Sequence, residues 1–225
     1  MSYTYSHPRP SVTVDACVFG VDAGALKILL IRRAQPPFKG SWALPGGFVQ
    51  MGESLEESAR RELSEETGFA PAYLEQLYTF GDVKRDPRGR VISVAYLALA
   101  KLAEAKAASD ADEARWWALD ELPDLAFDHG EIIRMAKKRL RAKVRYAPIG
   151  FDLLPRQFSL VELQALYEIL LGRGVDKANF RKKVLGMGLL KDTGKHSDAV
   201  RPARLYEFDA AEYERLSRRG FNFEL

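Results

Sequence analysis

The sequence predicts a sandwich of strands and helices, of the α+β or α/β class, followed by a smaller domain of two helices and a β-hairpin. Apolar residues alternate over residues 11–19 and recur at helical spacing over 128–143, so strands and helices mix along the first part of the chain. Proline and glycine cluster at residues 148–155, and the pattern changes behind them. We therefore expect one domain over residues 1–147 and a second over 148–225.

The composition is that of a globular protein, with 47% hydrophobic and 29% charged residues in a chain of 225. No apolar run approaches the length needed to span a bilayer, and the first ten residues lack the apolar core of a signal peptide. The single cysteine, Cys17, excludes an internal disulfide and lies in an apolar run typical of a core thiol. These observations indicate a cytoplasmic protein that does not enter a membrane.

The elements of the first domain follow from local patterns. Short apolar or β-branched runs indicate strands at residues 11–19, 26–32, 74–80, 91–100 and 114–119. The first two strands are joined by a tight turn, and a strongly charged turn at residues 81–90 joins the third to the fourth. In the helix expected at residues 128–143, the apolar side chains that face the core are Ile132, Ile133, Met135, Ala136 and Leu140.

A second helix of this domain is specified by its caps and its apolar stripe. Ser54 and Glu57 have the spacing of a capping box, and Gly68 stands where a left-handed C-terminal cap belongs. The stripe consists of apolar residues at every fourth position, namely Leu55, Ala59 and Leu63. The sequence therefore predicts a helix that begins after Ser54 and ends at Gly68.

This helix carries so many carboxylates that they reduce its stability, because like charges one turn apart repel. Helix formation alone therefore does not explain them. Glu62, Glu65 and Glu66 share one face by their i, i+3 and i+4 spacing. A hard cation such as Mg²⁺ prefers oxygen ligands and would convert that repulsion into a binding site. Arg61 lies one turn before Glu65 and can orient it, and the pair Gly46 and Gly47 lets the preceding loop bend toward a ligand.

The segment resembles the Nudix box, G-x5-E-x7-R-E-U-x-E-E-x-G-U, in which U is a bulky apolar residue. The positions of that pattern are filled by Gly47, Glu53, Arg61, Glu62, Leu63, Glu65, Glu66, Gly68 and Phe69. The resemblance covers about residues 10–145 and implies an α+β fold in which a mixed sheet lies between helices. It also implies hydrolysis of a nucleoside diphosphate linked to another group, with Mg²⁺ as cofactor and Mn²⁺ as a substitute.

The resemblance assigns expected roles to the acidic residues. Glu62, Glu65 and Glu66 are the expected metal ligands, and Glu65 is the first candidate for a base that acts on water. Spacing alone does not separate a ligand role from a base role. Glu53 is expected to pair with Arg61 and hold the loop. The expected catalytic set is therefore Glu53, Arg61, Glu62 and Glu65.

Residues 81–96 resemble a segment of ADP-ribose pyrophosphatase-like members of the family, which favours ADP-ribose as the ligand. The expected substrate contacts are Gly46, Gly47, Arg32, Arg33, Arg85 and Arg88. For any single arginine of the charged turn, a simple surface hairpin is an equally good explanation. Arg32 and Arg33 follow a strand, so one of them must face away from the site. His129 is either a base or ligand or merely a polar residue at a helix start, and Trp42 is expected to pack beside the loop.

The second domain has the element order of a winged helix-turn-helix. Ser159 and Glu162 form another capping box before a helix at residues 160–171, and Asp176 can cap a second helix at 177–185. Two strands at residues 189–193 and 203–208 follow, joined by a polar loop.

The charge of this second domain is concentrated on its second helix and its wing. Between Arg173 and Arg204 nine lysines or arginines stand against three aspartates. Such a helix suits the major groove of DNA, and a basic wing suits phosphate or minor-groove contact. The expected DNA contacts are Lys177, Asn179, Arg181, Lys182, Lys183, Lys195 and Arg201. A solvated basic face on an accessory domain is the alternative explanation.

Together the segments at residues 158–168, 176–183 and 201–208 resemble the Nudix-related transcriptional regulators, which join a Nudix domain to a winged helix. That resemblance implies control of NAD or sugar metabolism genes, with ADP-ribose or a related nucleotide as effector, a double-stranded DNA operator and a homodimer. Many such regulators have lost glutamates of the box, whereas this chain keeps them all. Two alternatives stay open: a regulator that only senses its ligand, and a housekeeping hydrolase whose tail serves dimerisation alone.

Overall fold

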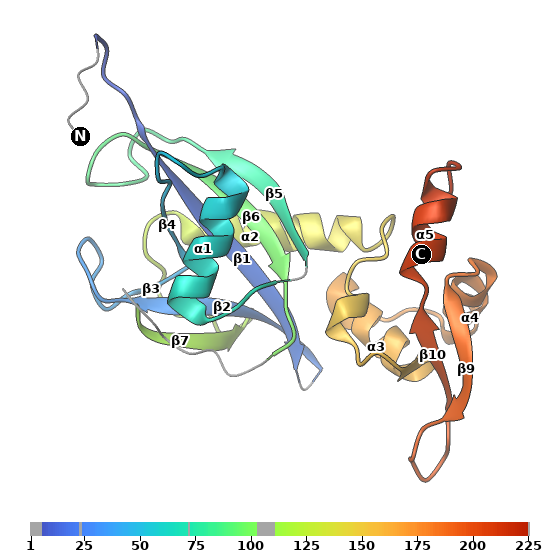
Figure 1. Cartoon of the computed structure of the whole chain (residues 1–225). Coiled ribbons are helices and arrows are strands. Elements are labelled where there is room, and N and C mark those ends of the chain that lie inside the picture. Colours follow the sequence, from blue (N-terminus) through green and yellow to red (C-terminus); the bar gives the residue numbers. More distant parts are fainter. Residues whose placement is uncertain (1–5, 23, 72, 103–110, 225) are drawn as a thin grey trace. The chain divides into compact units, whose positions relative to one another are not determined.

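The computed structural model describes residues 6–22, 24–71, 73–102 and 111–224 (Figure 1). The chain forms two compact units, one of Met1–Gly20 with Lys27–Ala136 and one of Val21–Leu26 with Lys137–Leu225. The division falls within helix α2 (His129–Lys143), so the domain ranges 1–147 and 148–225 stay a prediction. Within the described residues, no helix is both long and apolar enough to cross a membrane.

The first unit is built on a mixed seven-stranded sheet. Its main strand order is β3-β2-β1-β6-β5, with β4 paired to β1 and β7 paired to β2. β1 runs parallel to β6, whereas the β1–β4, β2–β3, β2–β7 and β5–β6 pairs are antiparallel, which confirms the expected mixed sheet. The strands are β1 (Ser11–Asp22), β2 (Ala25–Arg33), β3 (Trp42–Ala43), β4 (Gly46–Phe48), β5 (Tyr73–Phe80), β6 (Val91–Leu99) and β7 (Ala111–Ala118).

Helices cover the sheet through the apolar residues that the sequence singles out. Figure 1 shows helix α1 (Leu55–Thr67) in front of the sheet and the start of α2 behind it. Ala59 and Leu63, one turn apart, pack on strand residues such as Val14 and Val18. The capping box of Ser54 and the left-handed cap at Gly68 are both present, so α1 begins and ends where expected. The apolar stripe thus fixes which face of α1 remains for the carboxylates.

The second unit contains the expected helix, turn, helix and hairpin. Helix α3 (Leu160–Leu171) is capped by Ser159 in a capping box and ends at Gly172, with φ 68°. Helix α4 (Lys177–Gly186) begins at Asp176, which accepts a hydrogen bond from the backbone N–H of Asn179. The hairpin is formed by β9 (Leu190–His196) and β10 (Arg204–Phe208), and β8 (Phe158–Ser159) completes a sheet of order β8-β10-β9.

Aromatic packing explains two elements of this unit that sequence patterns did not predict. A 3₁₀ helix at Phe151–Leu153 places Phe151 in a stack on Phe208, with ring centroids 4.2 Å apart. Helix α5 (Ala210–Ser217) begins at Asp209, which caps it, and Tyr213 lies 6.3 Å from the ring of Phe208. The 3₁₀ helix is held by a contact between residues distant in sequence, which local periodicity does not report. α5 is held by local contacts, and its cap at Asp209 was a signal that the sequence analysis did not use.

Candidate functional site

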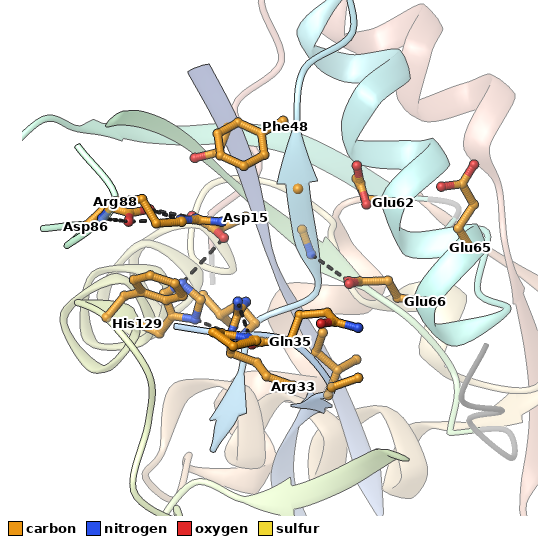
Figure 2. A pocket seen from close by; sticks show the side chains of 18 of the residues that line it. Asp15, Arg33, Gln35, Phe48, Glu62, Glu65, Glu66, Asp86, Arg88 and His129 are labelled. Carbon is orange, nitrogen blue, oxygen red and sulfur yellow. Dashed lines mark hydrogen bonds and ion pairs between the residues drawn. The ribbon is translucent and has the colours of Figure 1, made fainter. Parts of the chain in front are cut away.

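A cavity of about 430 Å³ opens in the first unit between α1, β1, β2, β4 and the loop before α2. Its walls carry opposite charges. One wall belongs to α1 and holds Glu62, Glu65 and Glu66, and another holds Arg33 and Arg88. Figure 2 shows the three glutamates on α1, across β4 from Asp15 and His129. A cavity with such walls suits a ligand that is itself charged and polar.

The glutamates of α1 differ in burial and therefore in electrostatics. Glu66 is buried and its Oε2 accepts a hydrogen bond of 2.8 Å from the backbone N–H of Gly46. Burial raises the pKa of Glu66 to about 8, although the Gly46 N–H lowers it, and the charge of Glu62 raises it further. Burial also raises the pKa of Glu62, against the effect of Arg61. Both carboxylates are thus poorly solvated as anions and would gain from a nearby cation.

Arg61 ties the acidic wall together. Its guanidinium donates to Glu53 at 2.9 and 2.7 Å, to Glu62 at 2.7 Å and to Glu65 at 3.1 Å. These bonds raise the pKa of Arg61, chiefly through Glu53, and the same pairing lowers the pKa of Glu53 to about 2. Glu53 also accepts from the backbone N–H of Gln50. As expected, Glu53 pairs with Arg61 and holds the loop before α1.

The acidic wall matches a divalent cation in its chemistry. Glu62, Glu65 and Glu66 offer carboxylate oxygens, which hard cations prefer, and all three border the same cavity. Among the described residues, no three acidic, histidine or cysteine side chains already surround a common metal position. Arg61 instead satisfies Glu62 and Glu65. The donor set fits Mg²⁺, and the metal assignment stays a prediction.

The basic wall is stacked on aromatic rings. Arg88 lies over Phe48 and Phe127, with its guanidinium carbon 4.8 and 5.5 Å from their centroids, and Arg33 lies 4.9 Å from the Phe127 centroid. Asp86 is buried and holds Arg88 by hydrogen bonds of 2.6 to 3.2 Å. Burial and the charge of Arg88 lower the pKa of Arg33. Two guanidinium groups that border the same cavity are suited to an anion with more than one charge.

The floor of the cavity is a buried polar network. Ser93 Oγ donates to Asp15 Oδ2, and Arg85 lies 3.5 Å from Asp15 and 2.7 Å from Asp128. His129 accepts a 2.9 Å bond at Nδ1 from the backbone N–H of Leu44, and its Nε2 lies 3.5 Å from Asp15. Because Nδ1 is the acceptor, the proton of the neutral imidazole belongs on Nε2. Burial lowers the pKa of His129, which favours this neutral form.

The basic surface of the second unit comprises α4 and the wing, the β9–β10 hairpin. Lys177, Asn179, Lys182 and Lys183 are exposed along α4, whereas Arg181 is partly buried. Among the described residues, Nε of Arg181 has no hydrogen-bond partner. On the wing, Lys195 and Arg201 are both exposed. A capped helix with a basic exposed side matches the geometry of a helix that enters the major groove.

The NUDIX domain model matches residues 9–136. The chain belongs to the NUDIX family. The NrtR DNA-binding winged helix domain model matches residues 150–208, so the basic helix α4 lies in a domain of a DNA-binding family. The two matches cover both units of this NUDIX protein and confirm the expected combination of folds.

Similar proteins share this combination. The ADPR responsive transcriptional repressor NtrR of Acinetobacter baylyi is 40% identical over 223 residues, which are 96% of this chain and 87% of that protein. The crystal structure of Shewanella oneidensis NrtR complexed with a 27mer DNA matches with a TM-score of 0.79 and 37% identity, covering 94% of this chain and 97% of that one.

The NUDIX domain alone has further relatives. The ADP-ribose pyrophosphatase of Methanocaldococcus jannaschii is 47% identical over 126 residues, 56% of this chain and 72% of that enzyme. The NUDIX domain of Shewanella oneidensis NrtR complexed with ADP ribose matches with a TM-score of 0.56 and 38% identity, covering 60% of this chain and 91% of that one.

Most of the expected site residues of this NUDIX domain border the cavity, but Glu53 and Arg32 do not. Glu53 acts on the site only through its pairing with Arg61. Arg32 is not among the lining residues, and its Nε donates to the carbonyl of Gly40, so Arg33 is the arginine of the pair that faces the site. Arg85 borders the cavity, but its charge is engaged by Asp15 and Asp128. Trp42 packs edge-on against Trp117 at 5.1 Å, as expected.

Sequence analysis missed several residues that line the cavity, namely Thr13, Asp15, Phe48, Asp86 and Phe127. One signal was available for Asp15. It stands at an alternate position in the apolar run of β1, where a charged residue needs a buried partner. The aromatic residues gave no such signal, because isolated phenylalanines are usual in cores and on surfaces.

Gly46 and Gly47 allow a test of how tightly β4 is fitted beside the cavity. A Cβ at Gly46 would lie 2.1 Å from the carbonyl oxygen of Val14, whereas one at Gly47 would meet the carboxyl group of Glu62 at 2.4 to 2.7 Å. We expect Gly46→Ala to lower the free energy of unfolding by about 1–3 kcal/mol, because backbone must move. Gly47→Ala should cost less, since a flexible side chain can yield. Urea unfolding of both variants measures the difference, and equal losses would contradict this reasoning.

Proposed function

We propose that this protein is a transcriptional repressor whose DNA binding responds to ADP-ribose, and that its NUDIX domain also hydrolyses ADP-ribose with the help of Mg²⁺. One observation supports both parts most directly. A single chain holds a full set of NUDIX carboxylates beside a cavity and a capped basic helix in an NrtR-type winged helix domain. The relatives are named as an ADPR responsive repressor and as an ADP-ribose pyrophosphatase.

The opposed walls of the cavity suit a diphosphate. Arg33 and Arg88 are placed to bind its oxygens, and the ring of Phe127 contacts both guanidinium groups. Glu62, Glu65 and Glu66 would hold Mg²⁺ on the other side, where the cation would neutralise the diphosphate and assist attack by water. This division of charge lets one anionic ligand face a wall of carboxylates without repulsion.

Hydrolysis would convert ADP-ribose and one water into AMP and ribose 5-phosphate. The water oxygen forms a bond to one phosphorus atom, and the bond from that phosphorus to the bridging oxygen breaks. The second phosphate leaves with the bridging oxygen. Glu65 is the first candidate to accept the proton of the water, since it borders the cavity and its side chain is half exposed. Arg61 would keep Glu62 and Glu65 oriented while the reaction proceeds.

DNA binding would use α4 and the wing. Lys177, Asn179, Arg181, Lys182 and Lys183 would approach the major groove and its phosphates. Lys195 and Arg201 would contact phosphates or the minor groove from the wing. Proteins that read two half-sites are usually symmetric dimers, so we expect a homodimer on a palindromic operator.

The proposal is tested by asking whether ligand and DNA affect each other. A ligand can shift DNA affinity only if it binds one conformational state better than another, and the coupling is reciprocal. We expect ADP-ribose to weaken binding to a promoter fragment from the protein's own locus by about 5-fold or more, within the usual range of such coupling. The Glu65→Gln variant should be used with fluorescence anisotropy, so that the ligand survives the titration.

The outcomes separate the explanations. Specific DNA binding with unchanged affinity in the presence of ADP-ribose would remove the response to the ligand. No specific DNA binding, together with hydrolysis of ADP-ribose, would favour a hydrolase whose tail serves dimerisation alone. A DNA response without any release of AMP by the wild-type protein would favour a regulator that only senses its ligand.

A further inference from the structure

The hydroxyl group of Thr13 is buried without a partner at the edge of the cavity. Thr13 lines the cavity and is 6% exposed, and among the described residues its Oγ1 has no hydrogen-bond partner. Buried hydroxyl groups are almost always hydrogen-bonded, so an exception requires an explanation. A valine has nearly the same shape without the polar atom. A threonine here is therefore explained if a bound molecule supplies the missing partner.

Asp15, two residues along the same strand, has unused acceptor capacity in the same cavity. Its Oδ2 accepts from Ser93 Oγ, but its Oδ1 is contacted by His129 Nε2 at 3.5 Å, longer than an ordinary hydrogen bond. Gly46 pairs with Asp15 across β4, and any side chain there would crowd this oxygen, because a Cβ would lie 3.0 Å from Oδ1. Thr13 and Asp15 project to the same face of β1 by their spacing. Figure 2 shows Asp15 joined to His129.

The chemistry of this pair selects the part of a ligand that it can bind. Asp15 is an acidic group beside a cavity that also contains Glu66, so a phosphate placed against Asp15 would be repelled. A carboxylate oxygen and a threonine hydroxyl together accept and donate hydrogen bonds, which suits the hydroxyl groups of a sugar. His129 Nε2–H is a further donor in the same place.

We propose that Thr13 and Asp15, supported by His129, form a subsite for the sugar hydroxyl groups of the ligand. This inference rests on the proposed function, which places a nucleoside diphosphate sugar in the cavity. Asp15 lies across β4 from the carboxylates of α1 and beside Arg88, so the sugar hydroxyl groups would lie next to the arginines that bind the diphosphate (Figure 2). Thr13 is thus a specificity residue and takes no part in bond breaking.

The test compares variants that remove or keep the Thr13 hydroxyl group, which without a ligand has no hydrogen-bond partner in the described part of the chain. In the unliganded protein Thr13→Val removes no hydrogen bond, so the melting temperature should be unchanged or higher. Binding of ADP-ribose should weaken about tenfold, because the bound hydroxyl loses its partner. Thr13→Ser keeps the hydroxyl and should retain most of the affinity. Thr79→Val makes the same change at an exposed position of β5 and serves as the control.

Calorimetry on full-length Glu65→Gln protein with Mg²⁺ compares ADP-ribose, ADP and inorganic pyrophosphate. Loss of affinity for ADP-ribose alone assigns the subsite to the terminal ribose, and an equal loss for ADP assigns it to the adenosine ribose. Pyrophosphate has no sugar and should bind all variants equally. Equal affinity of Thr13→Val and its parent for ADP-ribose, or an equal loss for pyrophosphate, would overturn the subsite. If the parent does not bind ADP-ribose and the wild-type protein neither binds nor hydrolyses it, the proposed function itself is overturned.

Discussion

Replacing Glu65 with glutamine will lower the rate of Mg²⁺-dependent AMP release from ADP-ribose by about 10²-fold or more, as expected for a side chain that combines ligand and base roles. Glutamine keeps the size of the side chain but lacks the negative charge and cannot accept the proton of water at neutral pH. The fold should survive, because Arg61 retains its bonds to Glu53 and Glu62. The measurement is chromatographic detection of AMP with and without Mg²⁺.

The matched control lies on the same helix. Glu56 pairs with Arg60 at 2.9 Å and is not among the residues lining the cavity. Glu56→Gln removes one negative charge from α1 and should leave the rate nearly unchanged. If Glu65→Gln releases AMP as fast as the wild type, the base and ligand assignments to Glu65 are wrong. If both variants slow the reaction alike, the total charge of α1 matters rather than this position.

The sequence predicted structure and function best where both depend on residues close together in the chain. α1 is the clearest case, since its caps at Ser54 and Gly68 and its stripe of Ala59 and Leu63 determine which face holds the glutamates. Helices α3 and α4 of the second unit were predicted for the same reason, because capping residues mark their starts. In each case the signal lies within a few residues of the element that it specifies.

Contacts between segments distant in the chain could not be predicted from such local patterns. β4 is three residues long and contains two glycines, which disfavour strands, and it becomes a strand because it pairs with β1 at Thr13, Val14 and Asp15. The floor of the cavity likewise joins Asp15 to Ser93 and His129, which come from β1, β6 and the start of α2. Spacing along one chain does not show which of its many polar residues will meet across a sheet.

Removing the two adjacent lysines of α4 will weaken DNA binding strongly at low salt. Each lysine that contacts a phosphate releases about one counterion, so the slope of log affinity against log salt should become shallower by about one per contact. For Lys182→Ala with Lys183→Ala the expected loss is on the order of 10²-fold at about 50 mM salt. Arg181→Ala should add to this loss, and anisotropy titrations at several salt concentrations measure both quantities.

The slope of log affinity against log salt distinguishes phosphate contacts made by α4 from a general attraction by the net charge of the protein. Arg218 and Arg219 are exposed at the end of α5 and lie outside the helix-turn-helix and the wing. Changing both to alanine removes the same two charges, yet it should leave the slope unchanged because no phosphate contact is lost. An equal effect of the two double variants would mean that net charge alone attracts DNA. If the Lys182→Ala, Lys183→Ala variant stays folded and binds DNA as tightly as the wild type, the lysines of α4 are merely solvated. The second unit would then serve another purpose, such as dimerisation.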